Sequence, residues 1–452
     1  MTKSFKKLWG RLLFQDRGIV PTGKFWMVYI LFSLLLVGLA LTGSSYSFLF
    51  LLNGLILGFS LVDLLLSPNP SEIEIERFAE EQMERDVDYH IQLRISNKSN
   101  KSFDYQLLDG TPQHFQTVFP VKGRMKGNQE VSTSYRVQAP IRGDFFLEKL
   151  YMRFKSRIGL WEKQTTFSLP QNIKVIPDLT ETRRILESSQ HHLLYEGTKI
   201  RKQQTGVGEF AKVRSYAVGD DPRKINWRQT AKLQQVMTNE YEPEHGKYIT
   251  ILIDCGRMMG GELKKGNRLE KSLEAAIAVA AAALSKGDYV SLLAFGKSVT
   301  VYIPPAKGMD HLQTILHKVY NVEVEASESN YASLVYYLEG RQKKRSLVLL
   351  FSDITTFLQE DSALIYLKQL RKRHFFFLIG IEDEEVVNAS RLEHTDIQTV
   401  MLKSMAQQQL MTKKAEKANW EKQGLHLVET KEEQLATAAI SYYIDILNKG
   451  LI

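Results

Sequence analysis

Two apolar runs near the start of the chain constrain its fold more than any other feature. The first extends from Phe25 to Thr42 and the second from Tyr46 to Leu66, with Gly43-Ser44-Ser45 between them. Each run approaches the roughly 20 residues that a helix needs to cross the core of a bilayer. The very short connection predicts a hairpin of two transmembrane helices over residues 25–66.

The charges beside the first run predict the orientation of this hairpin. Basic residues gather before it, at Lys3, Lys6, Lys7, Arg11, Arg17 and Lys24. Such residues stay on the cytoplasmic side of a membrane, and two crossings return the chain to that side. We therefore expect a multi-pass protein of the cell membrane, in contact with the lipid bilayer, whose soluble part after Pro68 is cytoplasmic. A cleavable signal peptide is the alternative for the first run, but a second run follows at once and the cleavage site is weak.

The polar residues add three expectations. Asp63 lies within a turn of the membrane edge and is expected to reach water, with a proton-relay role as the alternative. The single Cys255 rules out an internal disulfide and fits a reducing compartment. The net charge of +8 is moderate, and the basic runs at 343–345 and 371–373 are typical of solvated helix ends, so no nucleic-acid partner is expected.

Residues 72–178 have the alternation of half-buried strands. Val87, Tyr89, Ile91, Leu93 and Ile95 alternate with polar residues, and the pattern recurs from Val131 to Val137. Turn residues such as Asp109-Gly110 separate the strands. Several short strands at this spacing predict a small antiparallel sandwich or barrel, which acts as a spacer or as a binding module.

Apolar strands alternate with helices from residue 248 onward. Tyr248–Asp254 is a continuous apolar run, and an alanine-rich helix is expected at Arg268–Ser285. Further strands are expected at 289–295, 299–303, 346–351 and 375–381, and helices at 310–320, 331–341, 362–371 and 434–447. This order predicts a doubly wound α/β domain over residues 248–450. Ligands bind at the carboxyl ends of such strands, where Asp254 and Asp353 are located.

A stretch rich in arginine, aromatic and acidic residues precedes this domain. Residues 1–24 form the basic amino terminus, and residues 180–247 contain a helical linker and this signature segment, Gly208–Lys232. Its candidate partner-binding or domain-locking residues are Arg214, Tyr216, Gly219, Asp220, Asp221, Arg223 and Trp227. Arginine, tyrosine and tryptophan carry much of the energy of protein interfaces, and carboxylates can hold arginines in bidentate pairs.

The signature segment supplies no nucleophile with a matched base, so we predict no catalytic residue and no enzyme activity. Two interpretations remain. In the first, the acids and arginines pair internally and lock domains together, with Tyr216 and Trp227 as core residues. In the second, the segment is an exposed docking surface for a partner. Both can hold, with different residues serving each role. A third possibility, catalysis by the acids of Gly219–Arg223, would need a strongly perturbed carboxylate pair.

The signature resembles that of the domain of unknown function 58 (DUF58) family, whose pattern is roughly G-x-E-F-x-x-x-R-x-Y-x-x-G-D-D-x-R-x-I-x-W. Nearly every fixed position is filled, although Gly208 and Glu209 are adjacent where the pattern has a gap. Arg142–Phe145 and Ile158–Trp161 resemble two further elements of that family. The α/β arrangement is also similar to the von Willebrand factor A domain.

The likeness to von Willebrand A domains implies a metal-dependent adhesion site, which holds Mg²⁺ through a D-x-S-x-S motif. The corresponding residues here are Asp254-Cys255-Gly256-Arg257-Met258, so both serines are missing. Magnesium prefers hard oxygen ligands. We therefore expect a degenerate remnant at Asp254 and Asp353 without metal or other cofactor, with Arg257 neutralising the two acids and Cys255 buried as a small apolar residue.

The family resemblance also implies a partner. Such bacterial proteins are linked with MoxR-type AAA+ ATPases in chaperone-like assembly, which implies a membrane-tethered, non-enzymatic adaptor that binds this ATPase. The sequence contains no G-x-x-x-x-G-K-[ST] motif, so ATP hydrolysis would belong to the partner. The alternative function is a surface receptor whose von Willebrand A-like domain binds an extracellular ligand, which would require the opposite topology.

Overall fold

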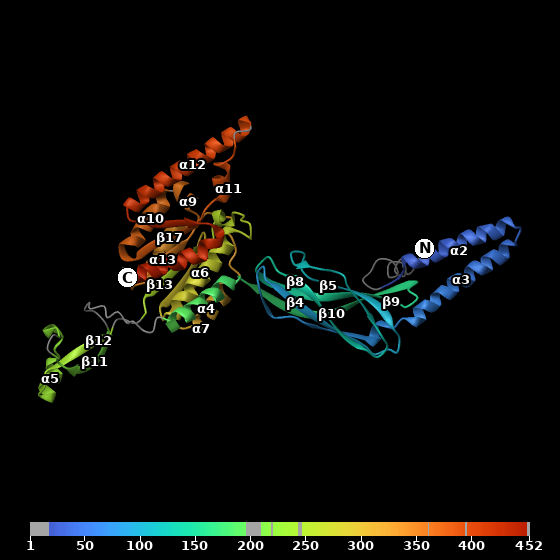
Figure 1. Cartoon of the computed structure of the whole chain (residues 1–452), viewed down its shortest axis with the longest axis horizontal. Helices are drawn as coiled ribbons and strands as arrows, with labels where there is room; N and C mark the ends of the chain where they lie inside the picture. Colours follow the sequence, from blue (N-terminus) through green and yellow to red (C-terminus); the bar gives the residue numbers. More distant parts are fainter. Residues whose placement is uncertain are drawn as a thin grey trace. The chain divides into compact units, whose positions relative to one another are not determined.

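The chain folds as two compact units, Met1–Ile176 and Pro177–Ile452. The computed structural model describes residues 18–195, 209–217, 220–242, 246–359, 361–393 and 396–449. Both units combine helices with sheets, so the predicted mixed α/β class is confirmed (Figure 1).

The two apolar runs form helices α2 (Gly23–Leu41) and α3 (Tyr46–Leu66). Both are long and apolar enough to cross a membrane, with mean hydropathies of 2.1 and 2.2. Most of their side chains face outward, as at Leu41 and Phe50, so the hairpin is not the core of a soluble fold. An exposed apolar surface of this extent indicates association with a membrane.

Two sheets enclose the core of the β-rich part of the first unit. The order of one is β1-β10-β9-β5-β7, with β3 parallel to β10, and the order of the other is β2-β4-β8-β6. The strands are β1 (Gly18–Pro21), β2 (Ile73–Phe78), β3 (Gln82–Glu84), β4 (Asp88–Asn97), β5 (Phe103–Asp109), β6 (Gln116–Thr117), β7 (Val121–Met125), β8 (Glu130–Gln138), β9 (Gly143–Ser156) and β10 (Trp161–Ile176). Ile91, Leu93 and Ile95 are fully buried, as their alternation predicts, and apart from β3 the pairing is antiparallel.

A six-stranded sheet forms the centre of the second unit. Its order is β15-β14-β13-β16-β17-β18, and all neighbours are parallel except β15. The strands are β13 (Tyr248–Asp254), β14 (Tyr289–Phe295), β15 (Val299–Ala306), β16 (Leu347–Phe351), β17 (Phe375–Ile381) and β18 (His426–Thr430). The expected strands therefore form within a few residues of their predicted bounds.

Helices cover both faces of this sheet (Figure 1). One face packs against α6 (Arg268–Ser285), α7 (Asp310–Val319) and α13 (Leu435–Asn448), with α4 (Thr180–Tyr195) beside α6. The other packs against α8 (Tyr331–Arg341), α9 (Ile354–Gln359), α10 (Asp361–Arg373) and α12 (Ile397–Lys422). A short helix, α11 (Glu384–Ala389), contacts α12.

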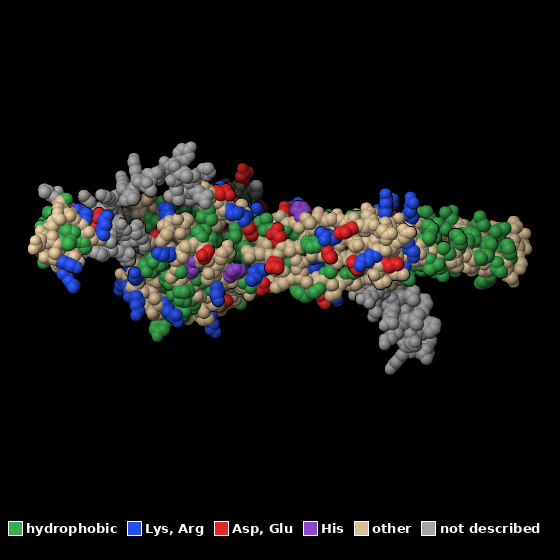
Figure 2. All heavy atoms as spheres, turned by 90° about the horizontal axis from the view of Figure 1, so that it is seen from below, with side chains coloured by type: hydrophobic (Ala, Val, Ile, Leu, Met, Phe, Trp, Pro, Cys, Tyr) green, Lys and Arg blue, Asp and Glu red, His purple; other side chains and the backbone are tan. Residues whose placement is uncertain are grey.

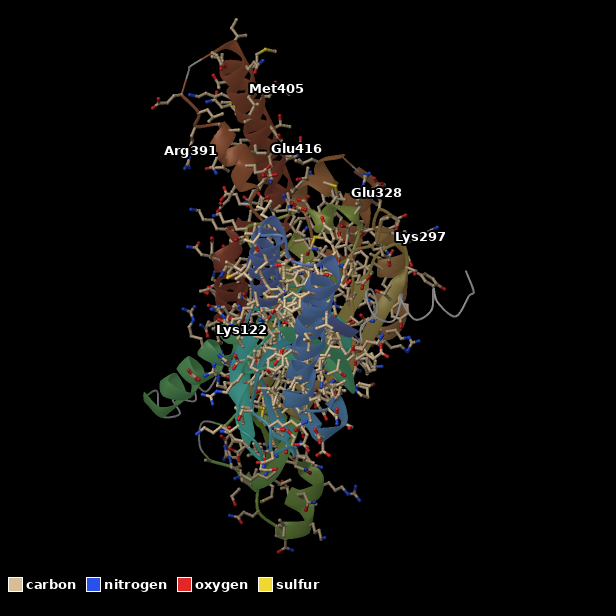
Figure 3. The ribbon with its side chains drawn as sticks, turned by 90° about the vertical axis from the view of Figure 1, so that its right-hand side faces the viewer. Lys122, Lys297, Glu328, Arg391, Met405 and Glu416 are labelled. Atoms are coloured by element: carbon tan, nitrogen blue, oxygen red, sulfur yellow. The ribbon has the colours of Figure 1, made fainter. Side chains whose placement is uncertain are left out.

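Helix α12 buries only Ala406 and Trp420. Its first half exposes Ile397, Val400, Met401 and Met405, spaced so that they share one side of the helix. Figure 3 shows Met405 toward the end of the helix that lies near α11 and Arg391. This helix therefore presents an apolar stripe to its surroundings.

The signature segment forms a small module of its own elements. Strands β11 (Glu209–Ser215) and β12 (Met237–Glu242) pair antiparallel. The 3₁₀ helix η2 (Pro222–Lys224) and helix α5 (Trp227–Leu233) connect them. The Asn226 side chain caps α5 by accepting from the Gln229 N–H. These elements and the residues beside them give the candidate residues other than Gly219 a defined backbone.

Candidate functional site

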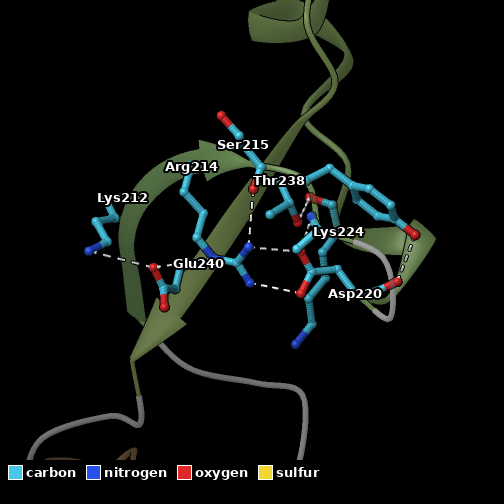
Figure 4. A network of polar contacts seen from close by, with 9 residues as sticks. Lys212, Arg214, Ser215, Asp220, Lys224, Thr238 and Glu240 are labelled. Carbon is cyan, nitrogen blue, oxygen red and sulfur yellow. Dashed lines mark hydrogen bonds and ion pairs between the residues drawn. The ribbon is translucent and has the colours of Figure 1, made fainter.

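A bidentate ion pair is the centre of the signature module (Figure 4). Arg214, on β11, donates to both carboxylate oxygens of Asp220, over 2.8 Å from Nη1 and 2.7 Å from Nη2. Its Nε also lies 3.6 Å from Glu240 on β12. Such fork-to-fork pairs fix geometry because both planar groups must align. The clamp therefore holds Asp220 in one position against β11.

Asp220 has two further contacts. Its carboxylate accepts from the Ala217 N–H over 2.9 Å, and its carbonyl accepts from the Tyr216 hydroxyl over 3.0 Å. The hydrogen bonds from Arg214 and then from Ala217 lower the pKa of Asp220. The carboxylate is thus held ionised by its neighbours, which is suited to a structural clamp and unsuited to a general acid.

The remaining signature residues differ in their exposure. Asp221 accepts from the Arg223 N–H over 3.0 Å and caps η2. Tyr216 is half-buried, whereas Trp227 is 71 % exposed, so the expectation that Trp227 is a core residue is wrong. Gly219 lies outside the described residues.

The outer surface of the module combines apolar and cationic side chains. Leu233 and Val236 are 55 % and 43 % exposed, and Arg223 and Arg228 are exposed as well. Tryptophan and arginine are residue types that are enriched at the centres of protein interfaces. Together with Trp227, these residues are defined here as the Trp227 surface.

The carboxyl ends of the parallel strands bring together a second group of polar residues. Asp254, at the end of β13, is 2 % exposed. One oxygen accepts from the Gly256 N–H at 2.8 Å and from the Ser329 hydroxyl. The other accepts from the hydroxyls of Tyr331 at 2.7 Å and Ser352 at 2.6 Å. Burial, and next the charge of Asp254, raise the pKa of Tyr331, which therefore stays a donor.

A guanidinium group neutralises the second acid of this edge. Arg268, the first residue of α6, lies with its Nη1 2.8 Å from Asp353, and both side chains are largely buried. Arg257, which was expected in this role, instead pairs with Glu328 over 2.9 Å at the surface. The expectation for Arg257 is wrong because its side chain points outward from the η3 turn (Arg257–Gly260), whereas the start of α6 faces the sheet.

These residues do not fit a magnesium ion. Mg²⁺ needs oxygen ligands with uncompensated charge in an octahedral array. The oxygens of Asp254 already accept four hydrogen bonds, and Asp353 is already paired with a cation. A side chain at position 256 would have its Cβ 2.2 Å from Ser329 Oγ, so Ser329 occupies the space where the motif would place a serine. In the described part of the chain, no three acidic, histidine or cysteine side chains form a metal-binding group.

A third polar site, at the base of the membrane hairpin, was not predicted from the sequence. Asp63 of α3 is 2 % exposed and accepts from the Leu160 and Trp161 N–H groups over 2.7 and 2.8 Å, and from the Ser156 hydroxyl. The expectation that Asp63 reaches water is therefore wrong. The turn that it binds is the Ile158–Trp161 motif, with Gly159 at a φ of 72° that favours glycine.

Further contacts surround this junction between α3 and the β9–β10 turn. Thr22 donates to the Gly159 carbonyl over 2.6 Å, and the Trp161 indole donates to Ser60 over 3.3 Å. The ring of Trp161 also packs on Phe25, with 5.0 Å between ring centroids. Two features of the sequence could have identified this site. One is Asp63, an acid inside an apolar run, and the other is the Gly-Leu-Trp turn at Gly159–Trp161.

The sequence of the signature module and the α/β sheet matches a known family. Residues 212–422 match the family described as "Protein of unknown function DUF58". The match extends from β11 to the end of α12, so it includes the clamp, the Trp227 surface and the Asp254 edge. The resemblance noted for the signature segment is confirmed over these residues.

Comparison with curated proteins finds the "Uncharacterized protein YeaD" of Bacillus subtilis (strain 168), 23 % identical over 207 residues. The match covers 45 % of this chain, and the chain spans about half the length of that relative, 49 %.

Among solved structures, the ASH/PapD-like domain 7 of human CEP192 matches 24 % of this chain and 89 % of its own, at 12 % identity and a TM-score of 0.18. A FixG-related protein from Vibrio parahaemolyticus matches 23 % of this chain and 96 % of its own, at 9 % identity and a TM-score of 0.18.

Proposed function

We propose that the protein is a membrane-tethered, non-enzymatic adaptor whose cytoplasmic head binds a protein partner through the Trp227 surface. The observation that carries this proposal is the 71 % exposure of Trp227 on a module in which Arg214 and Asp220 form a bidentate ion pair. An exposed aromatic residue on a preorganised backbone loses little conformational entropy on binding. The clamp then acts as the internal lock and Trp227 as the docking residue, so the two roles fall to different residues.

The strand order of the α/β sheet supports a von Willebrand A-like assignment for the head. Numbered along the chain, its strands lie in the order 3-2-1-4-5-6, with only the third antiparallel. Arg268 pairs with Asp353 at the strand edge where von Willebrand A domains bind their metal ion, and this supports a proposal in which recruitment does not depend on Mg²⁺. The partner would be bound by apolar and cationic side chains instead.

The proposed partner is a MoxR-type AAA+ ATPase in chaperone-like assembly, as the resemblance to the DUF58 family implies. The basic residues that precede α2 support the proposed cytoplasmic location of the head. The exposed stripe of α12, with Met401 and Met405, offers a second adaptable apolar contact, since methionine side chains repack easily against different partners.

The experiment that tests this proposal replaces Trp227 with alanine in the full-length protein. The Trp227→Ala variant should bind a purified MoxR-type ATPase at least tenfold more weakly, because buried tryptophans at interface centres contribute about 2 kcal/mol or more. Tyr336→Ala removes another exposed aromatic, 85 % exposed on α8, and serves as the matched control.

Circular dichroism should show that both variants keep the fold of the unaltered protein. Equal affinity of the Trp227 variant and the unaltered protein would refute docking at this surface. An equal loss of affinity in the Trp227 and Tyr336 variants would refute the specific role of Trp227 in docking.

A further inference from the structure

Two lysines meet at the end of the second membrane helix. Lys163, on β10, lies with its Nζ 3.0 Å from the Pro68 carbonyl oxygen and 3.5 Å from that of Ser67. Lys101, just before β5, reaches the same Ser67 carbonyl over 3.4 Å. Two ammonium groups thus share one carbonyl acceptor where α3 ends. Like charges in this position repel each other unless an anion lies between them.

The neighbouring carboxylates are engaged elsewhere. Asp63 accepts from the β9–β10 turn, and Glu72 accepts from the Asn69 N–H over 2.8 Å. Within residues 18–195, neither Lys101 nor Lys163 forms an ion pair. Burial, and next the charge of Lys101, lower the pKa of Lys163, and the nearby charges of Glu72 and Asp63 oppose this shift only in part. An anionic ligand would compensate the two cations.

The position of the pair along the hairpin indicates where that anion comes from. Leu66 is the last residue of α3, and Ser67 and Pro68 follow it directly, so the lysines lie at the level where a spanning helix leaves the hydrocarbon region. Figure 2 shows Lys and Arg side chains gathered where the apolar hairpin meets the β-rich part of the first unit. Lipid phosphates occupy this level of a bilayer, and basic pockets there bind anionic headgroups.

An apolar groove lies deeper on the same hairpin. It has a volume of about 420 Å³ and is lined by residues of both helices together with Leu160 of the β9–β10 turn. Ser60, which lines it, precedes Leu66, the last residue of α3, by six residues, so the groove reaches to about 9 Å from the end of the helix along its axis. The apolar groove is therefore placed to hold an acyl chain, and the lysine pair at the end of α3 is placed to hold its anionic headgroup.

We propose that Lys101 and Lys163 bind the phosphate of an anionic phospholipid, whose acyl chain occupies the groove between α2 and α3. The bound phosphate compensates the two cations and ties the β-rich part to the membrane surface beside the Asp63 junction. The proposal concerns the anchor alone and does not depend on the adaptor role of the head.

The test measures lipid binding to the full-length protein in uncharged detergent micelles by native mass spectrometry. The probes are dimyristoyl phosphatidylglycerol, dimyristoyl phosphatidylcholine and inorganic phosphate. The variant is Lys101→Gln/Lys163→Gln. Lys122→Gln is the matched control, because it removes the same charge from the exposed Lys122 of β7.

Phosphatidylglycerol should bind more tightly than phosphatidylcholine, and the double variant should lose about 25-fold in affinity, or about fivefold per lysine, as expected for cations at an anionic surface. Lys122→Gln should match the unaltered protein. If the double variant does not fold, Lys163→Gln alone should still lose about fivefold.

Equal affinity for the two lipids, or an unchanged affinity of the folded double variant, would overturn the proposal. Displacement of the lipid by inorganic phosphate at similar concentration would also overturn it, because the site would then recognise a free anion.

Discussion

Replacing Asp63 with alanine should detach the β9–β10 turn from the membrane hairpin. The substitution leaves the Leu160 and Trp161 N–H groups without their acceptor, at 2.7 and 2.8 Å in the structure. A buried donor left unsatisfied costs about 1–3 kcal/mol. Because this turn lies near the membrane edge, where water can reach an opened site, we expect about 1–2 kcal/mol for each N–H group and about 2–4 kcal/mol in all.

Amide hydrogen exchange of the full-length protein in nanodiscs measures this loss directly. The Leu160 and Trp161 amides should exchange about thirtyfold to several hundredfold faster in Asp63→Ala, since each 1.4 kcal/mol is a factor of ten. Asp63→Asn is the matched control, because its amide oxygen can still accept from both N–H groups and only the contact with Ser156 changes. The reasoning is refuted if Asp63→Ala leaves the exchange of these amides as slow as Asp63→Asn does.

Three further predictions concern the second unit. Arg268→Ala should lower the free energy of unfolding by about 3–5 kcal/mol in urea titrations, because it leaves Asp353 buried and unpaired, whereas Arg268→Lys should lose less. Asp220 has a folded-state pKa below its unfolded value of about 3.9, so the clamp should stabilise the module fully above that pH and progressively less below it. NMR titration should show this dependence become smaller in Arg214→Gln, with the Ala217 N–H still lowering the pKa of Asp220, and an unchanged titration would contradict it. Cys255 is 1 % exposed and should react with thiol reagents only on unfolding, so rapid labelling of the native protein would contradict its burial.

The sequence predicts the regular elements well where apolar residues follow a simple period. The bounds of β13, β14, β17, α6 and α8 agree with the expected ranges, because each element has a continuous or one-sided apolar pattern. Helices α9, α11 and α12 and strand β18 were missed. Helix α12 buries two side chains among 26 residues, so the packing that stabilises it leaves almost no periodic signal in the sequence.

The partners of the acidic residues were harder to predict than the elements that contain them. Arg257 follows Asp254 closely in sequence, yet Arg268 neutralises Asp353 because the amino-terminal end of α6 meets the carboxyl edge of the sheet. Likewise the acceptor role of Asp63 depends on a turn about a hundred residues later in the chain. Such contacts follow from tertiary packing, which a periodic pattern does not encode.

The carboxylates that stand out in the sequence share one physical property. Asp63 and Asp254 are bound by backbone and hydroxyl donors, and Asp220 and Asp353 are bound by arginines. The charge of each carboxylate is therefore compensated by hydrogen bonds or by an ion pair within the chain. A partner gains little from contact with a charge that is already compensated. If the head binds a protein, the free energy should then come mainly from exposed apolar side chains such as Trp227. Binding should accordingly resist chelators, and the exposed Arg223 and Arg228 should make it weaken as the salt concentration rises.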